Sequence, residues 1–210
     1  MPLDTLLLFV PACFALNMAF GPNNLLSITI GAHYGLRLAI LASVGRLVAF
    51  AIMIAVAALG MGALLMASQL AFTVCKLLGA AYLVWLGFKV FFSRATLSVD
   101  GLAGEQARGD IRTFIRREFL VAIGNPKAIL VFTAFFPQFV VPGNYWVSFL
   151  ILGGIFLSLE VVAIAAYAYA GSRLSGVIQN ARGLRWMNRI SGGTMILFGA
   201  ILALAKRPAA

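Results

Sequence analysis

The stretch Gly124-Asn125-Pro126-Lys127 places a proline and a full positive charge inside an apolar run that covers residues 119–141. Proline removes a backbone donor and glycine weakens a helix, so we expect a helix to be broken at this point. At membrane depth, freed backbone groups are tolerated only where they lie inside protein or line a water-filled cavity. The stretch therefore predicts a broken membrane helix that contributes to a ligand site.

A second stretch of the same kind, Phe20-Gly21-Pro22-Asn23-Asn24, interrupts the first apolar segment about a hundred residues earlier. It also combines glycine, proline and polar side chains within an apolar run, so we expect a second broken helix here. Transporters built from internal repeats place their substrate sites where such discontinuous helices meet near the bilayer midplane. Two breaks in corresponding segments therefore indicate a transporter.

Composition fixes the class of the protein. Hydrophobic residues make up 62% of the 210 residues and charged residues only 10%, which is typical of an integral membrane protein. A chain of this length has room for about six spans of about 20 residues each. We therefore expect an all-α, polytopic membrane protein with a single transmembrane domain over residues 1–210.

The formal net charge of +10 does not indicate nucleic acid binding, because the arginines cluster beside apolar runs. Topology signals and anionic lipid headgroups account for that pattern, so the lipid bilayer is the expected partner. The two cysteines, Cys13 and Cys75, lack the spacing of a disulfide framework or a zinc site. The sequence predicts no metal site and no cofactor.

Six apolar runs predict six transmembrane helices, at residues 3–30, 36–65, 69–92, 119–141, 145–170 and 186–205. The sizeable polar stretch between the third and fourth runs, residues 93–118, is expected to be a solvated loop with room for a short basic helix. Arginines concentrate in the links after the first, third and fifth helices. Under the positive-inside rule these links face the cytoplasm and both termini face outward.

The two halves resemble one three-helix unit used twice, with repeat one at about residues 1–92 and repeat two at about residues 119–210. In each half a broken helix comes first, a helix with one ionised residue second, and a glycine-containing helix third. Because three helices is an odd number, the second copy is inserted upside down, which predicts inverted-topology repeats. Glycines such as Gly87, Gly192 and Gly199 are expected at close helix packing positions.

Counting residues along the predicted helices places several polar groups at one depth. Arg46, Glu160, Lys127 and the break at Gly21 all come out roughly 15 Å from a membrane surface, close to the midplane. A charge at this depth costs at least about 2.5 kcal/mol, so these groups should face one another or water rather than lipid. The sequence therefore predicts a common polar site.

Each candidate residue also has a structural interpretation. The breaks at Gly21-Pro22 and Asn125-Pro126 are either helix kinks that shape packing or parts of a site. Asn23, Asn24 and Asn125 either cap freed backbone groups or contact substrate. Arg46 and Glu160 either form a structural ion pair or handle substrate or protons.

The motifs resemble the L-lysine exporter and homoserine/threonine resistance (LysE/RhtB) family of amino-acid efflux proteins, nearly from end to end. The resemblance rests on Gly21-Pro22-Asn23, on Gly79-Ala80-Ala81-Tyr82-Leu83 followed by Gly87, and on Asn125-Pro126-Lys127-Ala128 leading to Phe135-Phe136-Pro137-Gln138-Phe139. The family usually has Pro-Gly-Pro in its first helix, whereas Phe20 stands at the first proline here. Arg46 and Glu160 match no family position, so their roles rest on the depth argument.

The resemblance implies an efflux transporter of the bacterial inner membrane, driven by the proton-motive force, and not an enzyme. Its expected cargo is an amino acid or a similar small zwitterion, which needs a cationic partner for its carboxylate and an anionic or carbonyl partner for its amine. The expected substrate-binding residues are Gly21, Pro22, Asn23, Asn24, Arg46, Asn125, Pro126, Lys127 and Glu160. Glu160 is also the candidate for proton coupling, and homo-oligomer formation stays open.

Two other classes of function compete with this interpretation. An intramembrane thiol-disulfide conductor needs a cysteine at each broken helix, whereas Cys13 lies in the first predicted helix and Cys75 in the third. A non-transporting membrane scaffold would need only kinked helices. Transport of labelled amino acids in proteoliposomes distinguishes an exporter from a scaffold.

Overall fold

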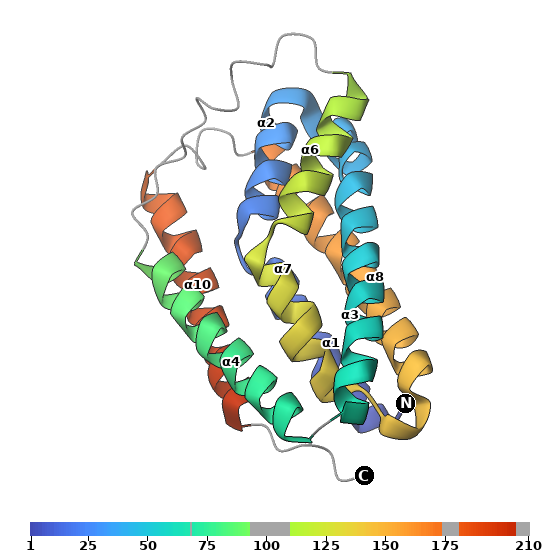
Figure 1. Ribbon diagram of the computed structural model, residues 1–210. Coiled ribbons are helices and arrows are strands. Elements are labelled where there is room, and N and C mark those ends of the chain that lie inside the picture. The colour runs from blue at the N-terminus through green and yellow to red at the C-terminus, as the bar shows by residue number, and fades with distance from the viewer. Residues whose placement is uncertain (68, 93–109, 174–180, 205–210) are drawn as a thin grey trace.

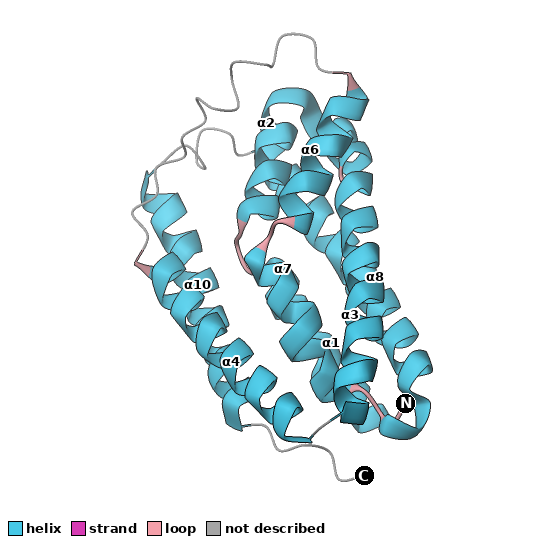
Figure 2. Ribbon diagram, in the orientation of Figure 1, coloured by secondary structure: helices cyan, strands magenta, loops and turns pink. Residues whose placement is uncertain are grey.

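The computed structural model describes residues 1–67, 69–92, 110–173 and 181–204, and all regular structure in these ranges is helical (Figure 1, Figure 2). The predicted all-α class is confirmed. The elements are α1 (Leu3–Met18), α2 (Pro22–Ala42), α3 (Val44–Ala67), α4 (Gln69–Phe91), α6 (Ile111–Ile123), α7 (Pro126–Leu130), η2 (Val131–Phe135), η3 (Phe136–Phe139), η4 (Pro142–Asn144), α8 (Tyr145–Arg173) and α10 (Ala181–Leu204).

The first helix interruption separates α1 from α2 at residues 19–21. Ala19 has extended backbone angles (φ −65°, ψ 127°), and Gly21 is extended as well (φ −165°, ψ −179°). Pro22 occupies the first turn of α2, where its missing N–H costs nothing and its fixed φ suits a helix. The chain therefore leaves the helical path and resumes it within three residues.

The second interruption separates α6 from α7. Gly124 follows the last residue of α6, Asn125 is extended (φ −78°, ψ 111°), and Pro126 begins α7. The axes of α6 and of the helical segment 126–139 are bent by 51° at this point. Both interruptions lie at the glycine- and proline-containing stretches of the sequence. That each interrupted pair acts as one membrane span stays a prediction.

The helical path inside α2 is broken at Gly35, which has a positive φ (φ 83°, ψ 166°) that favours glycine. Residues 36–42 then lead into α3 almost without interruption. The N–H of Ser43 donates to the Ala39 carbonyl, and the N–H of Leu47 donates to the Ser43 carbonyl. The hydrogen-bond ladder thus passes through Ser43, and Arg46 lies well inside this helical stretch.

The structure corrects the predicted loop at residues 93–118. Residues 93–109 lie outside the described part of the chain, but α6 begins at Ile111, with the Asp110 side chain accepting a hydrogen bond from the N–H of Arg112. Glu118, placed at the end of a solvated loop by the sequence analysis, is 0% exposed. The reason is the amphipathic character of α6, whose buried positions Phe114, Glu118 and Ala122 recur every four residues on one face.

Helices α2 and α8 cross at very short range because glycines face backbone at the crossing. A Cβ atom built at Gly31 would lie 2.3 Å from the Ala168 carbonyl oxygen, and one at Gly171 would lie 2.2 Å from the Ile28 carbonyl oxygen. Gly45 allows the same approach between α3 and α6, where a Cβ would lie 2.0 Å from the Ile115 oxygen. These crossings bring α2, α3, α6 and α8 together around the polar residues described below.

We expect the substitution Gly171→Ala to destabilise the protein by about 1 to 3 kcal/mol, the usual cost of overpacking. The added methyl group meets backbone rather than a flexible side chain, so the two helices must separate. Gly154→Ala, on the same helix, is the matched control because nothing lies within 4 Å of its Cβ position. Thermal unfolding in detergent measures both variants, and equal melting temperatures would contradict the close crossing.

Helices α4 and α10 pack chiefly on each other and form a pair beside the other helices (Figure 1). The predicted role of their glycines in close packing is confirmed. A Cβ at Gly192 would lie 2.5 Å from the Gly87 carbonyl oxygen, and one at Gly199 would lie 2.6 Å from Val84 Cγ2. The pair touches the remaining helices through smaller contacts of α4 with α3, α7 and η2 and of α10 with α1.

Within the described residues, α2 and α8 are long and apolar enough to cross a membrane, and the bent combination of α6 with residues 126–139 makes a third candidate span. The described part of the chain is thus all-helical, with two or three candidate spans by length and composition. The arrangement as six spans in two inverted repeats stays a prediction.

An aromatic core fills the space at one end of the interrupted helices. Phe9 of α1 stacks on Phe135 of η2, with ring centroids 5.5 Å apart. Phe132 meets Phe156 of α8 edge to face at 4.9 Å, and Phe50 of α3 meets Phe132 at 5.7 Å. This core holds α1, α3, α8 and the segment after α7 together on one side of the two breaks.

Candidate functional site

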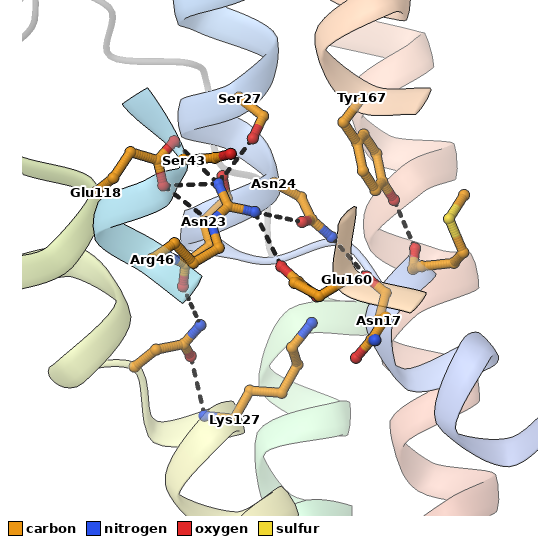
Figure 3. A network of polar contacts seen from close by, with 12 residues as sticks. Asn17, Asn23, Asn24, Ser27, Ser43, Arg46, Glu118, Lys127, Glu160 and Tyr167 are labelled. Atoms are coloured by element: carbon orange, nitrogen blue, oxygen red, sulfur yellow. Dashed lines mark hydrogen bonds and ion pairs between the residues drawn. The ribbon is translucent and has the colours of Figure 1, made fainter. Parts of the chain in front are cut away.

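Arg46 lies at the centre of a network of buried polar side chains (Figure 3). Arg46 is 0% exposed, and each of its three side-chain nitrogens donates to at least one acceptor. Nη2 donates to the Ser27 hydroxyl at 2.7 Å and to the backbone carbonyl of Asn23, and Nη1 lies 3.4 Å from Asn24 Oδ1. One guanidinium therefore ties α3 to the first turns of α2.

Two carboxylates neutralise Arg46, and they bind it in different ways. Glu118 of α6 accepts two parallel hydrogen bonds, from Nε to Oε2 at 2.8 Å and from Nη2 to Oε1 at 3.0 Å. This is the bidentate arrangement that fits a guanidinium best. Glu160 of α8 accepts one bond through Oε1, from Nη1 at 3.0 Å. The predicted contact between Arg46 and Glu160 exists, with Glu118 as a second anion beside it.

The carbonyl groups at the end of α1 are satisfied by side chains from distant segments. The last carbonyls of a helix have no partner within it, and at membrane depth each unsatisfied one is costly. Lys127 Nζ donates to the carbonyls of Leu16 at 3.1 Å and Ala19 at 2.8 Å. Asn24 Nδ2 donates to those of Asn17 at 2.9 Å and Ala19 at 3.0 Å. The Tyr167 hydroxyl donates to the Met18 carbonyl at 2.5 Å.

A hydrogen bond joins the two helix breaks. Asn125 Oδ1 accepts from the N–H of Lys127 at 3.0 Å and so caps the start of α7. Its Nδ2 donates to Asn23 Oδ1 at 2.6 Å, which links residues 102 positions apart. Asn23 is 4% exposed, and its own Nδ2 has no hydrogen-bond partner among the described residues. Native proteins leave few such groups, so this donor is a candidate contact for a ligand.

A small cavity of about 10 Å³ opens where the breaks meet. That is about the volume that admits one water molecule and is too little for an amino acid. Its polar lining comes from Asn17, Asn23, Asn24, Asn125, Lys127 and Glu160, and its apolar lining from Leu16, Phe50, Ala128, Val131 and Phe156. The binding of a larger molecule here requires the surrounding helices to move apart.

The structure brings most of the sequence-predicted site residues into this one region. Asn23, Asn24, Asn125, Lys127 and Glu160 line the cavity, and Arg46 lies behind them against Asn24 and Glu160. The remaining three, Gly21, Pro22 and Pro126, shape the breaks and offer no polar side chain. A Cβ atom at Gly21 would lie 3.7 Å from Lys127 Nζ, so the glycine leaves room for the ammonium group.

Sequence reasoning missed Glu118, Ser27, Asn17 and Tyr167. Glu118 was detectable, because its spacing from Phe114 and Ala122 continues one helix face. Ser27 lies four residues after Asn23 and so shares its face of α2. Asn17, whose Nδ2 donates to the Phe156 carbonyl at 3.2 Å, and Tyr167 carry no comparable signal, because their partners are backbone carbonyls of other segments.

The network consists of paired charges. Two cations, Arg46 and Lys127, and two anions, Glu118 and Glu160, balance one another in the network (Figure 3). The described residues contain no group of three or more histidine, cysteine or acidic side chains that could hold a metal ion. Cys13 is buried in α1 and Cys75 belongs to α4, so neither is part of a break.

Comparisons with known proteins agree with these features. Residues 14–206 match the family described as LysE type translocator. An uncharacterized membrane protein of Vibrio cholerae is 31% identical over 207 residues, which covers 98% of this chain and 100% of that protein. No solved structure matches the chain.

Two further relatives carry the names of transport proteins. The homoserine/homoserine lactone efflux protein of Salmonella typhimurium is 31% identical over 192 residues, covering 91% of this chain and 92% of the relative. The leucine efflux protein of an Enterobacter strain is 28% identical over 198 residues, covering 93% of each chain.

Proposed function

The chain belongs to the LysE type translocator family, and on that premise we propose that it exports neutral amino acids across the bacterial inner membrane. Family membership and the apolar helices make it an integral membrane transporter and not an enzyme. The observation that carries the proposal is the cavity between the two helix breaks, which has a lysine ammonium and a glutamate carboxylate in its lining.

The cavity offers complementary partners for the two charged ends of an amino acid. Lys127 has three ammonium donors, two of which reach the carbonyls of Leu16 and Ala19. The third donor, together with Asn23 Nδ2, is suited to bind the substrate carboxylate. Glu160 uses only Oε1 toward Arg46 and lies on the cavity wall, where it is suited to bind the substrate ammonium.

The charge balance of the network favours a substrate with no net charge. Its two cations and two anions leave no excess charge to pair with a basic or acidic side chain. The remaining lining is apolar, with Leu16, Phe50, Val131 and Phe156. The names of two relatives include homoserine and leucine, amino acids with uncharged side chains, and one of these names also includes homoserine lactone. A neutral amino acid of small or moderate size therefore fits best.

The proton-motive force is the proposed energy source, with Glu160 as the coupling group. Glu160 lies on the cavity wall and accepts one hydrogen bond from Arg46, so it exchanges partners more readily than Glu118, which accepts two. Glu160 would hold either the substrate ammonium or a proton, with Arg46 beside it in each case. This exchange couples the release of the substrate to the binding of a proton.

Six spans in two inverted repeats are the proposed membrane architecture. In this arrangement α1–α2 and α6–α7 are the broken helices, α3 and α8 follow them, and α4 and α10 complete the repeats. The two broken pairs run in opposite directions in Figure 1, as inverted repeats require. The arginine-rich links would then face the cytoplasm, with both termini outside.

We expect Glu160→Gln to reduce export about 10- to 100-fold, the equivalent of about 1.5 to 3 kcal/mol for one charged hydrogen-bond partner. Glutamine keeps the shape but removes the charge that binds an ammonium or a proton. The measurement is efflux of labelled leucine and homoserine from proteoliposomes. Asp4→Asn, which removes an exposed carboxylate at the start of α1, is the control. Unchanged export by Glu160→Gln would refute the assignment of Glu160.

A further inference from the structure

Glu118 is fully buried beside the proposed substrate site but does not line its cavity. Both of its oxygens face Arg46, at 2.8 Å from Nε and 3.0 Å from Nη2. A carboxylate in this geometry is fixed in place, because breaking away would cost two charge-assisted hydrogen bonds at once. Its role must therefore be exerted through Arg46.

Glu160 binds the same guanidinium from the other side with a single oxygen, at 3.0 Å from Nη1. It is 4% exposed and lies on the cavity wall with Lys127. Of the two glutamates, Glu160 is therefore the one that can leave Arg46 without disturbing the rest of the network. The guanidinium would still keep Asn23, Ser27 and Glu118 as partners.

The free-energy cost of moving Glu160 away from Arg46 depends on whether the guanidinium keeps another anionic partner. A buried cation that loses its last anion is strongly destabilised, whereas one that keeps a bidentate carboxylate is not. Because Glu118 neutralises Arg46 permanently, Glu160 is free to pair with another cation. Without the Glu118 charge, Arg46 would hold Glu160 as its only anionic partner.

We propose that Glu118 is a positioning residue that neutralises Arg46, so that Glu160 can exchange Arg46 for the ammonium group of the substrate. The inference rests on the proposed function, since it takes Glu160 as the ammonium partner. Glu118 sets the affinity of the cavity for its substrate and does not touch the substrate itself. The two hydrogen bonds between Glu118 and Arg46 also fix the plane of the guanidinium and hence the direction of Nη1 toward Glu160.

The test is the concentration dependence of leucine and homoserine export in proteoliposomes for Glu118→Gln. We expect KM to rise about tenfold, which corresponds to about 1.4 kcal/mol, with the maximal rate per folded molecule much less affected. Glu118→Asp keeps the charge but reaches Arg46 less well, so we expect a rise in KM that is smaller than for Glu118→Gln but still measurable. Asp110→Asn is the matched control, because it removes an exposed carboxylate from the start of the same helix and leaves a residue that still caps it.

A purely structural role would give the opposite pattern, with less folded protein and an unchanged KM in Glu118→Gln, and that result would overturn the proposal. If this variant fails to insert, the KM of Glu118→Asp is the test, because the shorter side chain weakens the two hydrogen bonds to Arg46. A KM for Glu118→Asp equal to that of the unchanged protein, at reduced yield, would again overturn it. Wild-type export by Glu160→Gln, by contrast, would refute the assignment of Glu160, and no export of leucine or homoserine by the unchanged protein would refute the proposed function itself.

Discussion

Replacement of Arg46 by alanine is expected to destabilise the protein by about 3 to 5 kcal/mol, the usual cost of removing one partner from a buried ion pair. The side chains of Glu118 and Glu160 are 0% and 5% exposed, and both depend on this guanidinium. The substitution also removes the donors to Ser27 and to the Asn23 carbonyl, so α2, α6 and α8 lose their common link. Thermal unfolding in detergent measures the loss.

The matched control removes all three charges together. In the triple variant Arg46→Met, Glu118→Gln and Glu160→Gln no unpaired charge is left, so it should be clearly more stable than Arg46→Ala. In the double variant Arg46→Met and Glu160→Gln, Glu118 would still lack its counter-ion. If the triple variant were no more stable than Arg46→Ala, charge pairing would not explain the role of Arg46. Export should stay low in the triple variant, because the proposed ammonium partner is absent.

The second large effect is expected for Lys127→Met, which should lower export to background and destabilise the protein. Methionine matches the length of lysine but cannot donate to the Leu16 and Ala19 carbonyls. Each unsatisfied backbone group at membrane depth costs several kcal/mol, although Asn24 still donates to the Ala19 carbonyl. Lys127→Arg, which keeps the charge, should retain stability better. Efflux from proteoliposomes and thermal unfolding report the two effects separately.

A double-mutant cycle tests whether Lys127 and Glu160 share one cavity. Because both residues line it, Lys127→Met and Glu160→Gln should show an interaction free energy of about 0.5 to 3 kcal/mol in substrate binding. Additive effects would place Lys127 outside the substrate site and leave it the role of capping α1. The same cycle in thermal stability separates the packing contribution from the binding contribution.

The predictable part of the site follows from local chemistry. The pairs Gly21-Pro22 and Asn125-Pro126 mark the helix interruptions in the sequence itself, whereas Pro11 lies inside α1 without ending it. Arg46, Lys127 and Glu160 stand out because a charge within an apolar run is costly unless it faces protein or water. These features depend on single residues and their immediate neighbours, so the sequence alone predicts which segments line the cavity.

The sequence by itself determined the membrane class, most of the helical elements but not the start of α6, the positions of both helix interruptions and three of the four charges in the network. Only the tertiary structure decided that Glu118 shares Arg46 with Glu160, that Lys127 and Asn24 cap α1, and that glycines hold α2 against α8. These contacts join residues far apart in the chain, 72 positions for Arg46 and Glu118 and 111 for Lys127 and Leu16. A residue pattern records which groups need partners, but the choice of partner depends on which helix faces meet when the segments pack.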